Sequence, residues 1–213
     1  PLFMSMDQVP YPSLALEVYR IGRGIDSVTI QAAGKISSPK KPVLGITLGS
    51  RFVPTDSYGQ LFVNHRGPTG VFEYVSAADV LRRPPLPELK DKYVLIGTSS
   101  TGLFDLRATP FSNAVPGVEI NATIIDNLIR SDPFTYDRLT EIGLNYTLIL
   151  AAGVTLTVLL ALLGPLAGSL GALLVFEFAL ILNYYYFFLN HRYVGMTYPL
   201  ASSVAILLAI TIF

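Results

Sequence analysis

The feature that most constrains this chain is a long stretch almost without charge in its last third. From Ile142 to Phe213 there are 72 residues, of which only Glu177 and Arg192 are charged. The preceding part carries 14 of the 15 Lys and Arg residues and 14 of the 15 Asp and Glu residues. This division predicts a water-exposed domain followed by segments that lie in a membrane.

The uncharged stretch divides into three runs long enough to cross a bilayer as helices. The first has 22 residues and would be about 33 Å long, against a hydrocarbon core of about 30 Å. Gly164-Pro165 breaks it, because proline disfavours helix in the residue before it. The sequence therefore predicts an all-α transmembrane region of three helices, a hairpin and a third helix, with spans at about 142–163, 166–189 and 193–213.

Glu177 lies near the middle of the second run. A central charge costs roughly 2.5 to 3.5 kcal/mol on an insertion scale, which the many Leu, Ile, Val and Phe residues of the run offset. Such a group either relays protons or hydrogen-bonds a neighbouring helix within or between subunits. We favour the helix contact, because a relay needs a second ionisable residue and none lies in any span.

The charged part has the pattern of an α/β domain. Pro12-Ser13 marks a helix start, and Ser76 with Asp79 resembles a capping box. Residues 93–97 read YVLIG, apolar throughout, which predicts a central strand covered on both faces. Further strands are expected at 28–32, 43–48 and 61–67, and a helix at 117–130.

The loop after residues 93–97 holds the candidate ligand-binding residues. Gly97 and Gly102 have the spacing of a phosphate-binding loop, but Leu103 and Phe104 replace its lysine and hydroxyl residue, so we favour a structural turn. Asp105 and Arg107 either latch this loop onto the sheet or bind a ligand, and the latch is favoured. The candidate set is Thr98, Ser99, Ser100, Asp105 and Arg107.

The common enzyme and metal signatures are missing from this sequence. It has neither H-E-x-x-H nor G-x-S-x-G, so we assign no catalytic residue, no metal site and no cofactor. His65 is expected to be a packed or surface histidine rather than a base. The net charge of zero argues against nucleic-acid binding, and the absence of cysteine excludes disulfides.

The motifs from residue 93 onward resemble the second CHASE family, an extracytoplasmic sensor domain associated with bacterial cyclases and histidine kinases. The resemblance rests on the strand, on Gly97, Gly102, Asp105, Arg107 and Thr109-Pro110, and on the P-G-V-E-I-x-A string from Pro116 to Ala122. YPSLALEVYR, VPTDSYG, FVNHRG and SAADVL resemble earlier landmarks of the family in the same order. The resemblance extends over about residues 1–130.

This resemblance implies a layout with one membrane helix before the sensor, three after it and then a cytoplasmic output module. It makes 1–138 the C-terminal portion of the sensor and 139–213 the transmembrane region, and both ends look cut. The entry to the last span, VGMTYPL, lacks the Trp and second Pro often found there. Arg138 and Arg192 would lie on the same side of the membrane, and their positive charges alone would place that side in the cytoplasm. Large domains translocate regardless of charge, so we keep the extracytoplasmic location that the resemblance implies.

We therefore expect the sensor and transmembrane portion of a bacterial receptor, multi-pass in the inner (plasma) membrane. Its expected partners are membrane lipid, a second copy in a homodimer, an output domain in cis and an unidentified extracytoplasmic stimulus. One alternative is that the full-length protein is an adenylate or guanylate cyclase or a protein kinase whose catalytic domain lies beyond residue 213. Another is a structural membrane subunit without a signalling role.

Overall fold

The computed structural model describes residues 1–7, 9–32, 42–82, 87–98, 105–136 and 138–212. It divides the chain into two compact units, Pro1–Pro133 and Phe134–Phe213. The assignment of 1–138 to the sensor and 139–213 to the membrane stays a prediction.

The first unit opens with a pair of antiparallel strands and a helix. Strand β1 (Phe3–Met6) pairs with β2 (Val9–Pro12), and α1 (Leu14–Gly22) follows directly. The hydroxyl oxygen of Ser13 accepts a 3.3 Å hydrogen bond from the Leu16 amide, so it caps the first turn. The helix start predicted at Pro12-Ser13 is confirmed.

The core of this unit forms between a three-stranded sheet and two helices. The predicted strands at 28–32 and 43–48 are present as β3 (Val28–Ala32) and β4 (Val43–Leu48), and β4 also pairs with β5 (Arg51–Pro54). All pairings in this sheet are antiparallel. Its inward residues pack with α1 and α3 (Gly117–Arg130), and the buried cluster is Leu2, Leu16, Tyr19, Ile46, Leu48, Val53 and Leu128.

Two predicted strands are wrong. Residues 61–67 contain only a single bridge at Phe62, because Asn64 and Arg66 bond to α3 instead of to a neighbouring strand. Residues 93–97 form no strand, and Ile96 is 96% exposed instead of central. An apolar strand is buried only when other strands flank it, and no described strand pairs with this segment.

The remaining elements of the first unit are short, except for α3. They are α2 (Ala77–Arg82), the 3₁₀ turn η1 (Pro87–Leu89), and the antiparallel pair β6 (Leu106–Arg107) and β7 (Val115–Pro116). The Ser76 hydroxyl accepts from the Ala78 amide at the start of α2, which supports the predicted cap. The helix predicted over 117–130 is confirmed as α3.

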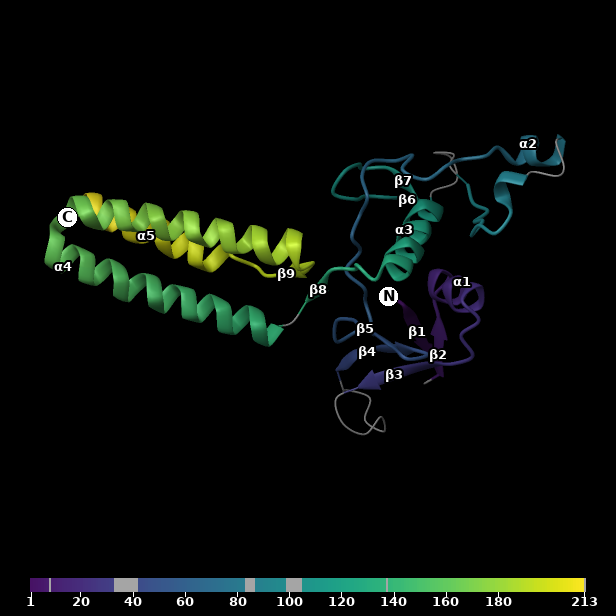
Figure 1. Ribbon diagram of the computed structural model, residues 1–213, viewed down its shortest axis with the longest axis horizontal. Helices are drawn as coiled ribbons and strands as arrows, with labels where there is room; N and C mark the ends of the chain where they lie inside the picture. The colour runs from purple at the N-terminus through teal and green to yellow at the C-terminus, as the bar shows by residue number, and fades with distance from the viewer. Residues whose placement is uncertain (8, 33–41, 83–86, 99–104, 137, 213) are drawn as a thin grey trace. The chain divides into compact units, whose positions relative to one another are not determined.

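The second unit consists mainly of two long helical segments. After β8 (Thr135–Tyr136) comes α4 (Arg138–Tyr184), continued by a π-helical turn η3 (Tyr185–Leu189). Gly164 inside α4 has φ 83° and ψ −177°, so the helix breaks there into two arms, and Figure 1 shows it doubling back on itself. The predicted break at Gly164-Pro165 is confirmed. Strand β9 (Arg192–Tyr193) pairs in parallel with β8, and α5 (Thr197–Ile212) packs on α4.

The third helix starts later than predicted, at Thr197 instead of Tyr193. Tyr193 is engaged in the β8–β9 pairing, which prevents it from entering the helix. Among the described residues one helix, Thr140–Leu189, is long and apolar enough to cross a membrane. Only 11% of its most apolar window is buried, unlike the core helix of a soluble protein.

Candidate functional site

The structure brings Asp105 and Arg107 together, as an exposed pair. Their closest charged atoms, Arg107 Nη2 and Asp105 Oδ1, are 3.8 Å apart, and both side chains are about half exposed or more. An exposed pair of this kind contributes little to stability. Thr98 is exposed in the extended segment before them, and Ser99 and Ser100 lie outside the described residues.

At two glycines in this region, Gly97 and Gly117, the loop and α3 lie too close together to leave room for a side chain. A Cβ at Gly117 would lie 2.5 Å from both carboxylate oxygens of Asp105, and the Gly117 amide donates a 2.8 Å hydrogen bond to the Asp105 carbonyl. A Cβ at Gly97 would lie 2.5 Å from the Cβ of Val118. Gly97 therefore allows the chain to pack closely against Val118 of α3, which agrees with the interpretation of this loop as a structural turn. Ligand binding by the five candidate residues stays a prediction.

The N-terminus of α3 is surrounded by acidic groups. Asp105 lies against Gly117, and Glu119 is buried in the first turn. Carboxylates compensate the positive end of the helix dipole and repel a further anion. The electrostatics at this position therefore oppose a phosphate ligand.

Glu119 anchors a loop that the sequence did not mark as functional. Its Oε1 accepts hydrogen bonds from the amides of Gly70 (2.9 Å) and Val71 (3.2 Å), and its Oε2 accepts from the Tyr74 hydroxyl (2.7 Å). Burial and this bond to Glu119 raise the pKa of Tyr74 to about 12. The loop end is therefore fixed to the first turn of α3.

The start of the same loop is fixed to the C-terminal half of α3. The side-chain amide of Asn127, fully buried, accepts from the Asn64 amide (2.8 Å) and donates to the Asn64 carbonyl (3.0 Å). Arg66 donates to Asp126 (2.6 Å) and Asp132 (2.7 Å), and these carboxylates raise the pKa of Arg66. We name residues 64–74 the strap, which runs along α3 from its end to its beginning (Figure 1).

The strap contains a histidine, His65. His65 lies between Asn64 and Arg66 and is half-buried, and burial lowers its pKa. A change in the hydration or protonation of His65 therefore acts on the segment that holds α3.

In the second unit, polar side chains gather around the segment that enters α5. Glu141 in the first turn of α4 accepts from the Gly195 amide (3.0 Å) and from the Tyr136 hydroxyl (2.7 Å). Asn145 donates to the Gly195 carbonyl (2.9 Å), and Asn183 donates to the Val194 carbonyl (3.2 Å). We name this cluster the collar: Tyr136, Glu141, Asn145, Asn183, Val194 and Gly195.

The collar connects β8 and both arms of α4 with the segment that enters α5. Aromatic contacts reinforce it, because Phe134 stacks on Phe187 with ring centroids 4.6 Å apart. Asn145 is buried, and its Oδ1 has no hydrogen-bond partner among the described residues. A displacement of the chain at Phe134 therefore reaches both α4 and α5.

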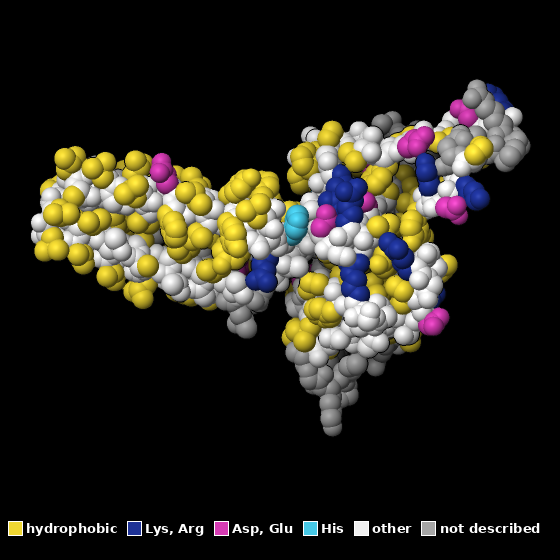
Figure 2. Space-filling model, viewed as in Figure 1, with side chains coloured by type: hydrophobic (Ala, Val, Ile, Leu, Met, Phe, Trp, Pro, Cys, Tyr) yellow, Lys and Arg dark blue, Asp and Glu magenta, His cyan; other side chains and the backbone are white. Residues whose placement is uncertain are grey.

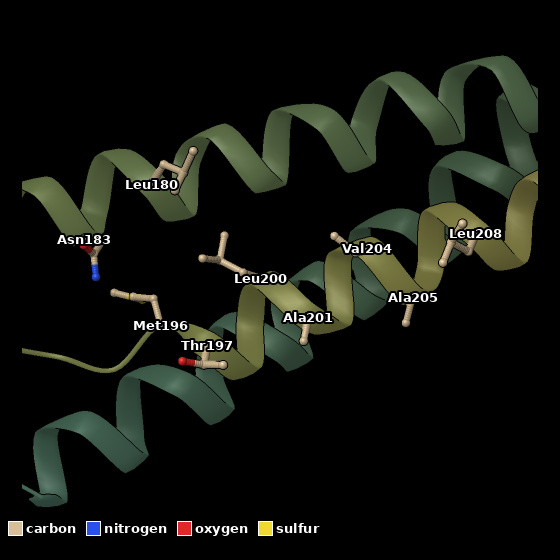
Figure 3. Close-up of a pocket in the computed structure, with 9 residues that line it drawn as sticks. All are labelled: Leu180, Asn183, Met196, Thr197, Leu200, Ala201, Val204, Ala205 and Leu208. Carbon is tan, nitrogen blue, oxygen red and sulfur yellow. The ribbon is translucent and has the colours of Figure 1, made fainter.

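Between α4 and α5 runs an open apolar groove of about 680 Å³ (Figure 3). Among the described residues that line it, Asn183 and Thr197 are polar, and both lie at the end nearest the collar. The remaining lining residues are Leu180, Met196, Leu200, Ala201, Val204, Ala205 and Leu208.

Glu177 lies apart from the collar and this groove's lining. Its side chain is exposed on the second arm of α4, and no described residue forms a hydrogen bond or ion pair with it. Contact with a neighbouring helix of the same chain, one of the two contacts expected from the sequence, is absent among the described residues. Contact with another subunit stays a prediction.

Sequence reasoning did not find the strap or the collar. Glu119 and Asn127 are polar residues among the apolar residues of α3. Because buried polar groups need hydrogen-bond partners, these two residues could have pointed to the strap. Glu141, Asn145 and Asn183 come together only through the break at Gly164 and the β8–β9 pairing, which no spacing in the sequence reveals.

Among the described residues no group of three or more His, Asp or Glu side chains is placed to hold a metal ion. A comparison with protein families matches residues 1–164 to the model of the CHASE2 domain. No curated protein and no solved structure matches the chain. The matched range includes the first unit and the first arm of α4, and it ends at the break, Gly164.

Proposed function

The chain belongs to the CHASE2 domain family, and from this membership we propose that it is the sensor and transmembrane portion of a signal-transduction receptor. CHASE2 is an extracellular sensor domain of signalling receptors, so a sensor role follows from the family. One observation carries the extension to the membrane. The family match continues from the first unit into the first arm of α4, whose apolar surface is largely exposed.

In this proposal the strap is the sensing element. Its Asn64 and Arg66 bind the C-terminal half of α3, its Gly70 binds Glu119 in the first turn of α3, and exposed residues follow it. A stimulus that binds two arrangements of the strap unequally would shift α3 between them. The exposed pair Asp105 and Arg107, with Thr98, Ser99 and Ser100, remains the candidate contact for that stimulus.

The collar would pass the change from α3 to the membrane helices. The chain leaves α3 at Arg130 and reaches β8 within five residues. There Tyr136 binds Glu141 of α4, and Glu141 binds Gly195 before α5. A displacement of β8 would therefore move α4 and α5 together.

We further propose that both arms of α4, with α5, cross the membrane. Arms of 24 and 25 residues, Thr140–Leu163 and Pro165–Leu189, would each be about 36 Å long, enough for a core of about 30 Å. α5 has 16 helical residues, about 24 Å, which reaches across most of that core. The output module, a nucleotide cyclase or a protein kinase, would be carried in cis on the cytoplasmic side, and the receptor would act as a homodimer.

Labelling of single cysteines tests this topology, because the natural chain has no cysteine. Tyr58→Cys reports on the first unit, where the side chain is 77% exposed, and Leu166→Cys reports on the turn of α4, at 78% exposed. In intact cells a membrane-impermeant maleimide should label Tyr58→Cys only. Leu166→Cys should react after the cells are permeabilised.

Labelling of both variants in intact cells would contradict the proposed topology. Recovery of the chain from a membrane-free fraction without detergent would contradict the membrane location itself.

A further inference from the structure

The second arm of α4 presents one continuous exposed stripe. It consists of Leu170, Leu174, Glu177, Ile181 and Tyr184, whose spacing is four, three, four and three residues. The four apolar members are 57 to 64% exposed, and Glu177 is exposed as well. A spacing of this kind places all five side chains on one face of a helix, as in the seam of a coiled coil.

The stripe lies opposite the surface that α4 uses within its own chain. On this arm Gly168, Ala172 and Ala179 are buried, and they lie about half a turn from Glu177. Hydrophobic side chains cover the visible face of the helical unit, and acidic side chains are scarce there (Figure 2). Within the second unit, no described helix therefore covers the stripe.

The carboxyl group of Glu177 determines which kind of surface can cover the stripe. A carboxyl group in an apolar surface requires a hydrogen-bond partner, and lipid acyl chains offer none. A neutral carboxyl group carries one donor and can also accept, so two such groups complement each other. A second copy of this chain brings that partner, and copies inserted in the same direction place each residue of the stripe beside its own counterpart.

We infer that the stripe is the interface between two copies of this chain, with the two Glu177 carboxyl groups hydrogen-bonded across it and fixing its register. The inference rests on the membrane location in the proposed function. A single polar residue at one seam position is the known means of fixing register in coiled coils. The π-helical turn at Tyr185–Leu189 changes the spacing of side chains and so ends the stripe after Tyr184.

Disulfide formation in the full chain, reconstituted in lipid vesicles, tests the interface. Leu174→Cys lies on the stripe, ten residues after Gly164, and its matched control Val154→Cys lies ten residues before Gly164 on the other arm. Their natural side chains are 64% and 58% exposed, so depth and exposure are similar. Oxidation should produce a dimer from Leu174→Cys in clear excess over Val154→Cys. Equal yields would overturn the inference.

A second pair of variants tests the role of Glu177. In the Leu174→Cys background, Glu177→Gln keeps a donor and an acceptor and should preserve the dimer yield. Glu177→Leu should weaken association about threefold, the size of an average hydrogen bond between membrane helices. An unchanged yield in Glu177→Leu would remove Glu177 from the interface, and a crosslink to a different protein would overturn self-association.

The two proposals can be separated. If Leu166→Cys is labelled only after permeabilisation while Leu174→Cys forms no excess dimer, the interface is wrong and the proposed function stands. If the chain is not held in the membrane, both are wrong.

Discussion

The hydroxyl of Tyr74 donates a 2.7 Å hydrogen bond to Oε2 of Glu119, and this joins the end of the strap to the first turn of α3. The two residues are 45 positions apart in the sequence. Because Glu119 also accepts from two backbone amides, one buried carboxylate holds the whole end of the strap.

Replacing this carboxylate should destabilise the first unit. Glu119→Ala leaves three donors without their acceptor and should lower the free energy of unfolding by about 2 to 4 kcal/mol. Tyr74→Phe removes one bond of a side chain that is 49% exposed and should cost at most about 1 kcal/mol, because water can replace part of the lost interaction. Urea-dependent proteolysis of the full chain measures both. Tyr58→Phe, an exposed tyrosine with no hydroxyl bond among the described contacts, is the control and should change stability little.

Alkaline pH should weaken the same contact. The folded-state pKa of Tyr74 is raised from 10 to about 12, so its contribution to stability is complete below pH 10 and is lost as the pH rises toward 12. The stability difference between the natural chain and Tyr74→Phe should therefore shrink over that range. A difference that stays constant from pH 9 to pH 12 would show that Tyr74 ionises as freely in the folded chain as in the unfolded one.

Mild acid should act on the strap through His65. Burial lowers the pKa of His65 in the folded state from its ordinary value of 6.5, so the unfolded chain binds the proton more readily. Stability should be complete above pH 6.5 and fall as the pH drops from 6.5 toward the lower folded-state pKa. His65→Gln should lose this part of the pH dependence, measured as unfolding midpoints between pH 7.5 and pH 5. Identical pH profiles for the two chains would contradict the prediction.

Arg66 should contribute more to stability than a surface lysine does. Its contacts of 2.6 and 2.7 Å involve side chains about one-fifth exposed, whereas Lys92 and Glu73 are 3.7 Å apart and more than half exposed. We expect Arg66→Ala to cost about 2 to 3 kcal/mol and Lys92→Ala at most about 1 kcal/mol. Chemical unfolding of the two variants compares them directly, and equal costs would mean that the Arg66 contacts are no stronger than an exposed pair.

The approach of Asp105 to Gly117 predicts a compensating pair of substitutions. Gly117→Ala forces the Asp105 carboxylate away from α3 and should cost about 1 kcal/mol, because this half-exposed side chain can shift. In an Asp105→Ala background the same substitution should cost less than about 1 kcal/mol, because the obstructing atoms are gone. A double-mutant cycle measures this coupling, and additive effects would place Asp105 elsewhere.

Local signals in the sequence predicted local structure well. Ser13 before an apolar face predicted α1, the alternating residues of 28–32 predicted β3, and the glycine and proline at 164–165 predicted the break in α4. For α1 and for the break, the deciding interactions are formed by residues close together in the sequence, and for β3 the partner strand β4 is the next strand along the chain.

Predictions that depended on distant partners were less successful. The apolar run at 93–97 was expected to be a central strand, but strand burial depends on neighbours that the run itself does not specify. The segment at 61–67 starts with three apolar residues, as a strand would, yet Asn127 and Asp126 of α3 bind the polar residues that follow them. Most contacts of the strap likewise join residues 45 to 66 positions apart. In the collar, the two contacts of Gly195 join residues 50 and 54 positions apart.

The break at Gly164 limits the kinds of motion that this protein can use. A single non-helical residue joins the two arms of α4. If one arm slides along its axis, it therefore carries the other arm with it in the same direction in space. A piston stroke of one helix against its neighbour is therefore disfavoured in this hairpin. The two arms can tilt or rotate together without stretching the backbone at Gly164, and we expect the signal to cross the bilayer through such a motion.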